Sequence, residues 1–217
     1  MENLDLVFKN LLERGYSQVQ AYQLLFLYNF YKEKQRDKEF NEFLNLINTN
    51  YEAEALEQII KCIAHNTPYR LFIGHENLNI EVMNEIRRYL EGCKKFTSEI
   101  ERRKLYYIAK KIIDYDWNAN VIYQFRRFLK LDSITCEEME YLFDLIMQNK
   151  IEHWTILNSF YTIYTEYSFT ELKRFVNSDA IKNLLIEYVK YKNSKEQQKL
   201  DRALVYIFSY ANNWSKK

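Results

Sequence analysis

The sequence predicts an all-α protein, and the scarcity of two residue types is the main reason. The 217 residues include only three glycines and one proline. Tight turns, β-hairpins and phosphate-binding loops usually require these residues, because other side chains resist the backbone angles involved. Apolar residues also recur at helical spacing along most of the chain. We therefore expect a multi-helix bundle or a short α-solenoid of about 10–12 helices joined by short polar loops.

Polar breaks divide the chain into helical segments, and capping residues mark several of their ends. Gly15 follows the first segment, where a glycine favours helix termination, and Ser17 is a candidate N-cap for the second. Thr135 and Glu138 have the spacing of a capping box. The expected helices cover residues 4–14, 17–35, 53–64, 80–91, 151–167, 170–177, 180–192 and 195–211; four more begin at Asp37, at Thr97 (ending near Asp116), at Asn118 or Asn120 (ending near Leu131) and at Thr135.

Apolar stripes indicate which face each helix should bury. The second helix carries its stripe at Val19, Tyr22, Phe26 and Phe30, and the third at Phe40, Leu44 and Ile47. Four others share the spacing i, i+3, i+7 that any amphipathic helix produces. They are Leu56/Ile59/Ile63, Met83/Ile86/Leu90, Ile122/Phe125/Leu129 and Met139/Leu142/Ile146. Short helices with short connections suit successive antiparallel packing or a stacked solenoid.

A single all-helical domain over residues 1–217 is the expected organisation. The interval 67–79 is the least helical part of the chain, because it contains Pro68, Gly74 and several polar residues. It is the expected boundary if the chain subdivides, into residues 1–66 and 80–217.

Charge and hydropathy exclude several classes of protein. The chain has 31 basic and 30 acidic side chains and a formal net charge of +1, whereas a dedicated nucleic-acid binder is usually strongly basic. No apolar run approaches the ~20 residues that a membrane span requires. Residues 1–8 carry two acids and no basic cluster of the kind that begins a signal peptide. We expect a soluble, cytoplasmic protein without a membrane partner.

One segment resembles a known group of repeats. Residues 73–91, IGHENLNIEVMNEIRRYLE, are similar to one unit of the degenerate helical repeats found in proteins of Gram-positive bacteria and their mobile elements. The matching residues are Glu81, Met83, Ile86, Arg87 and Leu90, and the chain has Tyr89 where the group usually has glycine. The resemblance covers about one tenth of the chain and includes no catalytic residue. It implies an α-repeat fold and a bacterial or phage origin.

Cysteine and histidine spacing does not favour a metal site. The three cysteines, Cys62, Cys93 and Cys136, are odd in number and far apart, which argues against disulfides. Cys62 and His65, with His75 and Cys93 downstream, provide four potential zinc ligands. Structural zinc sites normally use two close pairs of ligands, and only one is present here. We expect no metal and no other cofactor.

Arg70 and His75 form R-x-x-x-x-H, the outline of the nuclease motif of HEPN ribonucleases. In such a motif histidine transfers a proton and arginine stabilises a phosphate, and both must lie on one helix. Pro68 and Gly74 make a continuous helix improbable here. No nucleotide-binding, zinc-protease or nucleophile-elbow motif is present either. We therefore expect a non-enzymatic protein without catalytic residues, and keep a HEPN-like ribonuclease as an alternative.

One local cluster combines basic and aromatic residues. Its members are Lys94, Lys95, Arg102, Arg103, Lys104, Tyr106, Tyr107, Lys110, Lys111, Arg126 and Arg127. Arginine forks bind phosphates and tyrosine rings stack on unpaired bases, so the cluster is a candidate RNA or DNA site. The same residues also suit an acidic protein surface. The simpler interpretation is a solvated helix face neutralised by neighbouring acids, among them Glu99 and Glu101.

The function that these observations favour is binding to a macromolecule, most simply another protein. With 19 tyrosines and 14 phenylalanines, the chain has many aromatic side chains that can anchor a protein interface. The resemblance to repeats of mobile elements implies a phage- or plasmid-encoded regulator or inhibitor of bacterial defence. An RNA- or DNA-binding protein that uses the basic and aromatic cluster is the main alternative.

Overall fold

A computed structural model describes residues 4–33, 53–65, 67–73, 75 and 77–214. Of these residues 80% are helical, in eleven α-helices and a few short 3-10 turns, and none lies in a strand. The predicted all-α class is confirmed. The expected helix from Asp37, with its stripe at Phe40, Leu44 and Ile47, lies outside the described residues. None of the helices described here has both the length and the apolar character needed to cross a bilayer.

The chain forms two compact units, Met1–Arg87 and Arg88–Lys217. The boundary falls within α5 rather than in the irregular interval 67–79. Phe72 of that interval is fully buried, so this side chain belongs to the core of unit 1. Unit 1 contains α1 (Leu4–Glu13), α2 (Gln18–Glu33), α4 (Ala53–Ala64), the 3-10 turn Tyr69–Phe72 and the first part of α5 (Ile80–Gly92).

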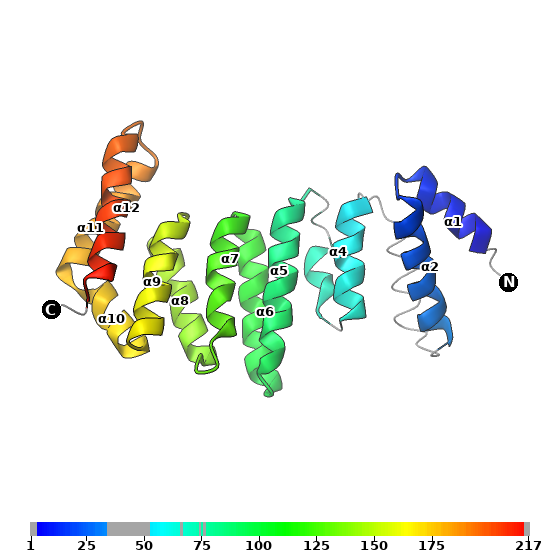
Figure 1. Cartoon of the computed structure of the whole chain (residues 1–217), viewed down its shortest axis with the longest axis horizontal. Helices are drawn as coiled ribbons and strands as arrows, with labels where there is room; N and C mark the ends of the chain where they lie inside the picture. Colours follow the sequence, from blue (N-terminus) through cyan, green and yellow to red (C-terminus); the bar gives the residue numbers. More distant parts are fainter. Residues whose placement is uncertain (1–3, 34–52, 66, 74, 76, 215–217) are drawn as a thin grey trace. The chain divides into compact units, whose positions relative to one another are not determined.

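Unit 2 continues with seven further helices in the described residues. They are α6 (Glu99–Asp114), α7 (Ala119–Arg127), α8 (Cys136–Gln148), α9 (Trp154–Glu166), α10 (Phe169–Asn177), α11 (Asp179–Lys192) and α12 (Gln197–Asn212). In this unit α7 packs against α9 and α6 packs against α8, so alternate helices lie side by side (Figure 1). Helix α9 also packs against α10 and α12. This arrangement is that of a stacked helical repeat, one of the two predicted alternatives.

Hydrogen bonds between helices of unit 2 reveal a regular period along the chain. Lys104 bonds to Glu140, 36 residues away. The amide of Asn118 donates to the carbonyl of Glu152, 34 residues away. The N–H of Glu152 in turn donates to the hydroxyl of Tyr188, 36 residues away. The repeating element of unit 2 is therefore a pair of helices of roughly 35 residues, within the usual range for such repeats.

Most of the predicted apolar stripes are buried. Leu56 and Ile59 in α4, and every member of the stripes in α5, α7 and α8, are no more than 4% exposed. The structure does not describe the side chain of Ile63. Tyr89 is also fully buried and donates its hydroxyl hydrogen to the Leu105 carbonyl at 3.2 Å.

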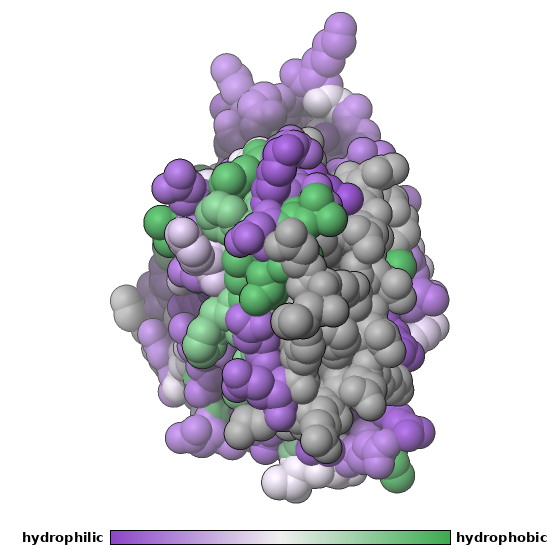
Figure 2. Space-filling view, turned by 90° about the vertical axis from the view of Figure 1, so that its right-hand side faces the viewer, coloured by the Kyte–Doolittle hydropathy of each residue, from purple (hydrophilic) through white to green (hydrophobic). Residues whose placement is uncertain are grey.

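The predicted stripe on α2 is wrong. Val19 and Phe26 are 68% and 71% exposed, and Tyr22 and Phe30 are also exposed. The helix instead buries Ala21 and Leu24. Helix α2 has no charged residue before Lys32 and carries apolar side chains around most of its circumference, so the pattern did not single out one face. Figure 2 views the molecule from the side of α1 and α2, where apolar side chains lie among polar ones.

Capping residues fix the helix starts largely as predicted. The Ser17 hydroxyl accepts from the Gln20 N–H at 3.2 Å, and the Gln20 side chain accepts from the Ser17 N–H at 3.0 Å. Asn118 caps α7, with its side chain accepting from Val121 at 3.0 Å. Helix α6 begins one residue later than expected, because Ser98 rather than Thr97 is its cap.

Helix ends explain how a chain with three glycines makes its turns. Gly15, Asp116 and Lys150 all have positive φ, of 87°, 52° and 48°. At each of them the next residue donates its N–H back to a carbonyl in the last turn of the preceding helix. These three bonds are Tyr16 to Leu11, Trp117 to Ile112 and Ile151 to Ile146. All six of these residues are buried, so each bond lies in the core, and two non-glycine residues, Asp116 and Lys150, adopt a left-handed conformation beside it.

Helix α5 ends at Gly92, but this glycine is not in a left-handed conformation. Its φ of −62° is helical, and the chain continues into the 3-10 turn Cys93–Lys95. A side chain at this position would lie 3.1 Å from Leu129 Cδ1. A residue larger than glycine would therefore require the Leu129 side chain to shift.

Replacing Lys150 by glycine is expected to stabilise the protein by about 0.5–1 kcal/mol, because glycine adopts the left-handed conformation without steric strain. Lys182→Gly is the matched control: Lys182 is also exposed but lies inside α11, where glycine should cost about 1 kcal/mol. Urea denaturation followed by circular dichroism measures both. Equal destabilisation by the two substitutions would contradict the strain argument.

Candidate functional site

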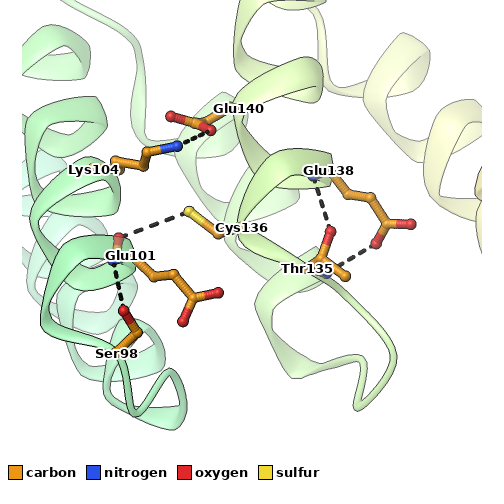
Figure 3. Close-up of polar contacts among 7 residues, drawn as sticks. All are labelled: Ser98, Glu101, Lys104, Thr135, Cys136, Glu138 and Glu140. Atoms are coloured by element: carbon orange, nitrogen blue, oxygen red, sulfur yellow. Dashed lines mark hydrogen bonds and ion pairs between the residues drawn. The ribbon is translucent and has the colours of Figure 1, made fainter.

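Helices α6 and α8 frame the part of the molecule to which the basic and aromatic cluster belongs. Each begins at a defined cap: the Ser98 hydroxyl accepts from Glu101, and Thr135 and Glu138 form the predicted capping box. In that box the Thr135 N–H donates to Glu138 Oε2 at 2.9 Å, and the Glu138 N–H donates to the Thr135 hydroxyl at 3.2 Å. The caps set where the side chains of the two helices face one another (Figure 3).

Two contacts join the helices directly. Lys104 Nζ lies 3.1 Å from Glu140 Oε2, and the Cys136 thiol donates a weak hydrogen bond to the Glu101 carbonyl at 3.8 Å (Figure 3). The hydrogen bond and charge of Glu140 raise the pKa of Lys104. Both ion-pair partners remain substantially exposed, so this pair contributes little to the stability of the fold. Its main effect is to order the two side chains at the surface.

A groove of about 620 Å³ lies between the two helices. Tyr107, Ile108 and Phe143 supply its apolar surface. Arg103 and Lys104 line it from α6, and Glu140 and Asp144 line it from α8. The groove therefore combines an apolar surface with one basic and one acidic side, and only part of the predicted cluster contributes to it.

Several of the predicted cationic side chains bind groups of this chain. The Arg102 guanidinium donates to the carbonyls of Phe96 and Thr97, each at 2.8 Å. Arg103 forms an ion pair with Glu99 within α6. Lys95 donates to the Leu131 carbonyl and lies 5.3 Å from the Phe96 ring centre. These contacts resemble the solvated, internally neutralised helix face that the sequence allowed as the simpler interpretation.

The remaining members of the cluster divide between exposed and packed positions. Lys94 and Lys110 are exposed, and Lys111 lies 5.2 Å from the ring centre of the exposed Tyr107. Tyr106 is half-buried, and burial raises the pKa of its hydroxyl. The cluster thus offers cations at the surface of α6 without forming a continuous unpaired stripe.

Arg126 and Arg127 lie on α7, which packs most extensively against α9. Arg126 is buried, with its guanidinium 4.9 Å from the Tyr123 ring centre. Arg127 lies 3.8 Å from the Tyr161 ring centre and donates to Asn158 at 2.8 Å. Neither residue lines the groove between α6 and α8. The expected joint surface of α6 and α7 arginines is not formed there.

The proposed catalytic pair lacks the helix that its chemistry needs. Arg70 lies in the 3-10 turn Tyr69–Phe72, which ends at Ile73 in an extended conformation. His75 follows this break. The two side chains therefore do not share one helical face, as the HEPN motif requires.

The four potential zinc ligands are not gathered at one site. Cys62 is fully buried whereas His65, three residues later, is exposed. Among the described residues, no group of three or more His, Cys, Asp or Glu side chains is arranged to hold a metal ion.

Phe143, Glu140 and Asp144 are groove residues that the sequence analysis did not single out. All three lie within five residues after Met139, which belongs to the predicted apolar stripe of α8. They line the groove from the side of α8. A comparison of segments roughly 35 residues apart would have aligned α6 with α8 and indicated this pairing.

We found no family model that matches the chain, and no curated protein or solved structure that is significantly similar to it.

Cys136 is expected to react slowly with thiol reagents in the folded protein. Its side chain is buried beside α6, and burial raises the pKa of the thiol to about 11. Burial also raises the pKa of Cys93. Thiolate is the reactive form, so at about pH 8 the rate should be at least ~100-fold below that of an exposed thiol, tenfold for each unit of pKa.

Time-resolved labelling with Ellman's reagent, with and without denaturant, provides the measurement. A Cys136→Ser variant identifies the signal of this residue. Labelling of Cys136 at the rate of an exposed thiol would show that α6 and α8 do not pack as described.

Proposed function

We propose that this chain is a non-enzymatic, all-helical binding protein whose partner is another protein, bound in the groove between α6 and α8. The groove carries the proposal because it combines apolar side chains with walls of opposite charge. A protein segment can match such a surface with an apolar face and charged residues of both signs. Tyr107, which is 58% exposed, is the natural anchor, because tyrosine is enriched among the residues that dominate interface energies.

Nucleic acid fits the same groove less well. Phosphates would meet Glu140 and Asp144 on one wall, and like charges at an interface are strongly unfavourable. On the other wall, Arg103 and Lys104 are already paired with carboxylates. Arg102 is held by two backbone carbonyls. An RNA or DNA partner would have to break these contacts before it could bind the cations.

The HEPN-like ribonuclease alternative draws no support from Arg70 and His75, because Ile73 between them is in an extended conformation. The narrower hypothesis, a phage- or plasmid-encoded regulator or inhibitor of bacterial defence, rests on the resemblance of residues 73–91. It stays a prediction about the identity of the partner.

Tyr107→Ala tests the groove, and Tyr206→Ala on α12 is its control, because the two tyrosines are similarly exposed, at 58% and 61%. Partners captured by the wild-type chain from a lysate of the organism that encodes it are purified, and their dissociation constants are measured. If Tyr107 is an anchor, its loss should raise Kd about 30-fold or more. Tyr206→Ala should leave Kd unchanged.

A second experiment tests the main alternative, an RNA- or DNA-binding protein. Labelled single-stranded RNA and DNA are titrated with the wild type and with a variant in which Arg102, Arg103, Lys110 and Lys111 are all alanine. We expect no sub-micromolar binding at physiological salt. Tight binding that the four substitutions abolish, with the fold intact, would overturn the protein-binding proposal.

A further inference from the structure

A second concave site lies at the other end of unit 2, where the end of α9, helix α10 and the end of α12 meet. Its volume is about 670 Å³. Three of its lining residues are aromatic, Tyr167, Tyr210 and Trp214, and the charged ones are Glu171 and Arg174. It shares no lining residue with the groove between α6 and α8.

The aromatic side and the carboxylate are held in place by the fold. Trp214 packs edge-on against the buried Phe175, with ring centres 5.2 Å apart, and lies 5.9 Å from the Tyr210 ring centre. The Trp214 Nε1–H donates to Glu171 Oε2 at 3.1 Å. The Ser168 hydroxyl caps the Glu171 N–H at 3.2 Å, which fixes the backbone of this residue. A ring face and a negative charge are thus preorganised beside each other.

A guanidinium already lies at this site. Arg174 Nη1 is 3.6 Å from Glu171 Oε2, and the guanidinium centre is 5.9 Å from the Trp214 ring centre. The Arg174 side chain is nevertheless 73% exposed, and exposed ion pairs of this kind are weak. The position of Arg174 therefore indicates that the site suits a guanidinium group. Because the Arg174 side chain is held weakly, it can move into solvent at little cost in free energy.

We propose that this pocket binds an arginine side chain of a partner protein, which takes the place of Arg174 between Trp214 and Glu171. A planar guanidinium can stack on the indole and direct two N–H groups at the carboxylate. A lysine ammonium is more strongly hydrated and offers neither the plane nor the fork. The site is independent of the α6–α8 groove, so either proposal can fail without the other.

The test uses blocked arginine, Nα-acetyl-L-arginine amide, and the indole N–H signals of the 15N-labelled protein. The chain has three tryptophans, and Trp214→Phe identifies the signal of Trp214. Blocked arginine should shift this signal and leave those of Trp117 and Trp154 unchanged. Blocked lysine should bind several-fold more weakly, since it lacks the stacking plane.

Arg174→Ala provides the decisive variant. It removes the competing guanidinium, so blocked arginine should bind about 3–10-fold more tightly than to the wild type. Arg202→Ala removes the same charge from an exposed position on α12 that does not line the pocket, and should change the affinity by less than about twofold because a distant exposed charge is screened by salt. Adding Glu171→Gln to Arg174→Ala should abolish binding. Tyr167→Ala changes an exposed lining residue, so it should not disturb folding, and it should weaken the binding of blocked arginine. This variant keeps the test valid if the Glu171 variant folds poorly.

Three results would overturn the proposal. The first is no shift of the Trp214 signal in the Arg174→Ala variant at tens of millimolar blocked arginine. The second is equal binding of blocked lysine and blocked arginine. The third is binding of inorganic phosphate that Arg174→Ala abolishes, which would make the pocket an anion site.

Discussion

The helices of unit 2 are too short to be stable alone, and this constraint accounts for most of the structure. They contain 9 to 16 residues, close to or below the ~12–15 residues under which isolated helices are marginal in water. Each must bury its apolar stripe against its neighbours. Phe125 of the nine-residue α7 shows how this is done. It is fully buried, stacks on Tyr89 of α5 at 5.6 Å, and lies 5.7 Å from Trp117 and 6.5 Å from Phe143 of α8.

The same packing creates the two concave surfaces. Where alternate helices lie side by side, side chains beyond the buried stripe face each other across a groove, as Lys104 and Glu140 do between α6 and α8. At the junction of α9, α10 and α12, the contact between Trp214 and Glu171 spans 43 residues of sequence. Neither surface requires an irregular loop, so a chain poor in glycine can form both. Recognition through rigid helices also loses less conformational entropy on binding than recognition through loops.

Local signals in the sequence predicted the fold well. Ser17, Asn118 and Thr135 cap helices as expected, and α6 ends near Asp116, at Asp114. The sequence did not predict features that depend on how the helices pack against one another. Helix α2 is apolar on several faces, so the stripe at Val19 and Phe26 was a poor guide to burial. The cationic cluster was interpreted as one surface because its members are close in sequence. In the structure Arg127 packs on Tyr161, whereas Lys104 faces α8. The pocket at Trp214 left no local pattern at all, since its residues meet only in the folded chain.

Hydrogen exchange in a Phe125→Ala variant tests most directly whether the helices of unit 2 depend on one another. Phe125 contacts residues of α5 and α8 as well as the turn at Trp117, so its loss should lower amide protection in α5, α7 and α8 together. Removal of a buried phenylalanine typically costs about 3–5 kcal/mol, enough to make the change large. Reduced protection confined to α7, with α5 and α8 protected as in the wild type, would show that the helices are individually stable. That result would contradict the account.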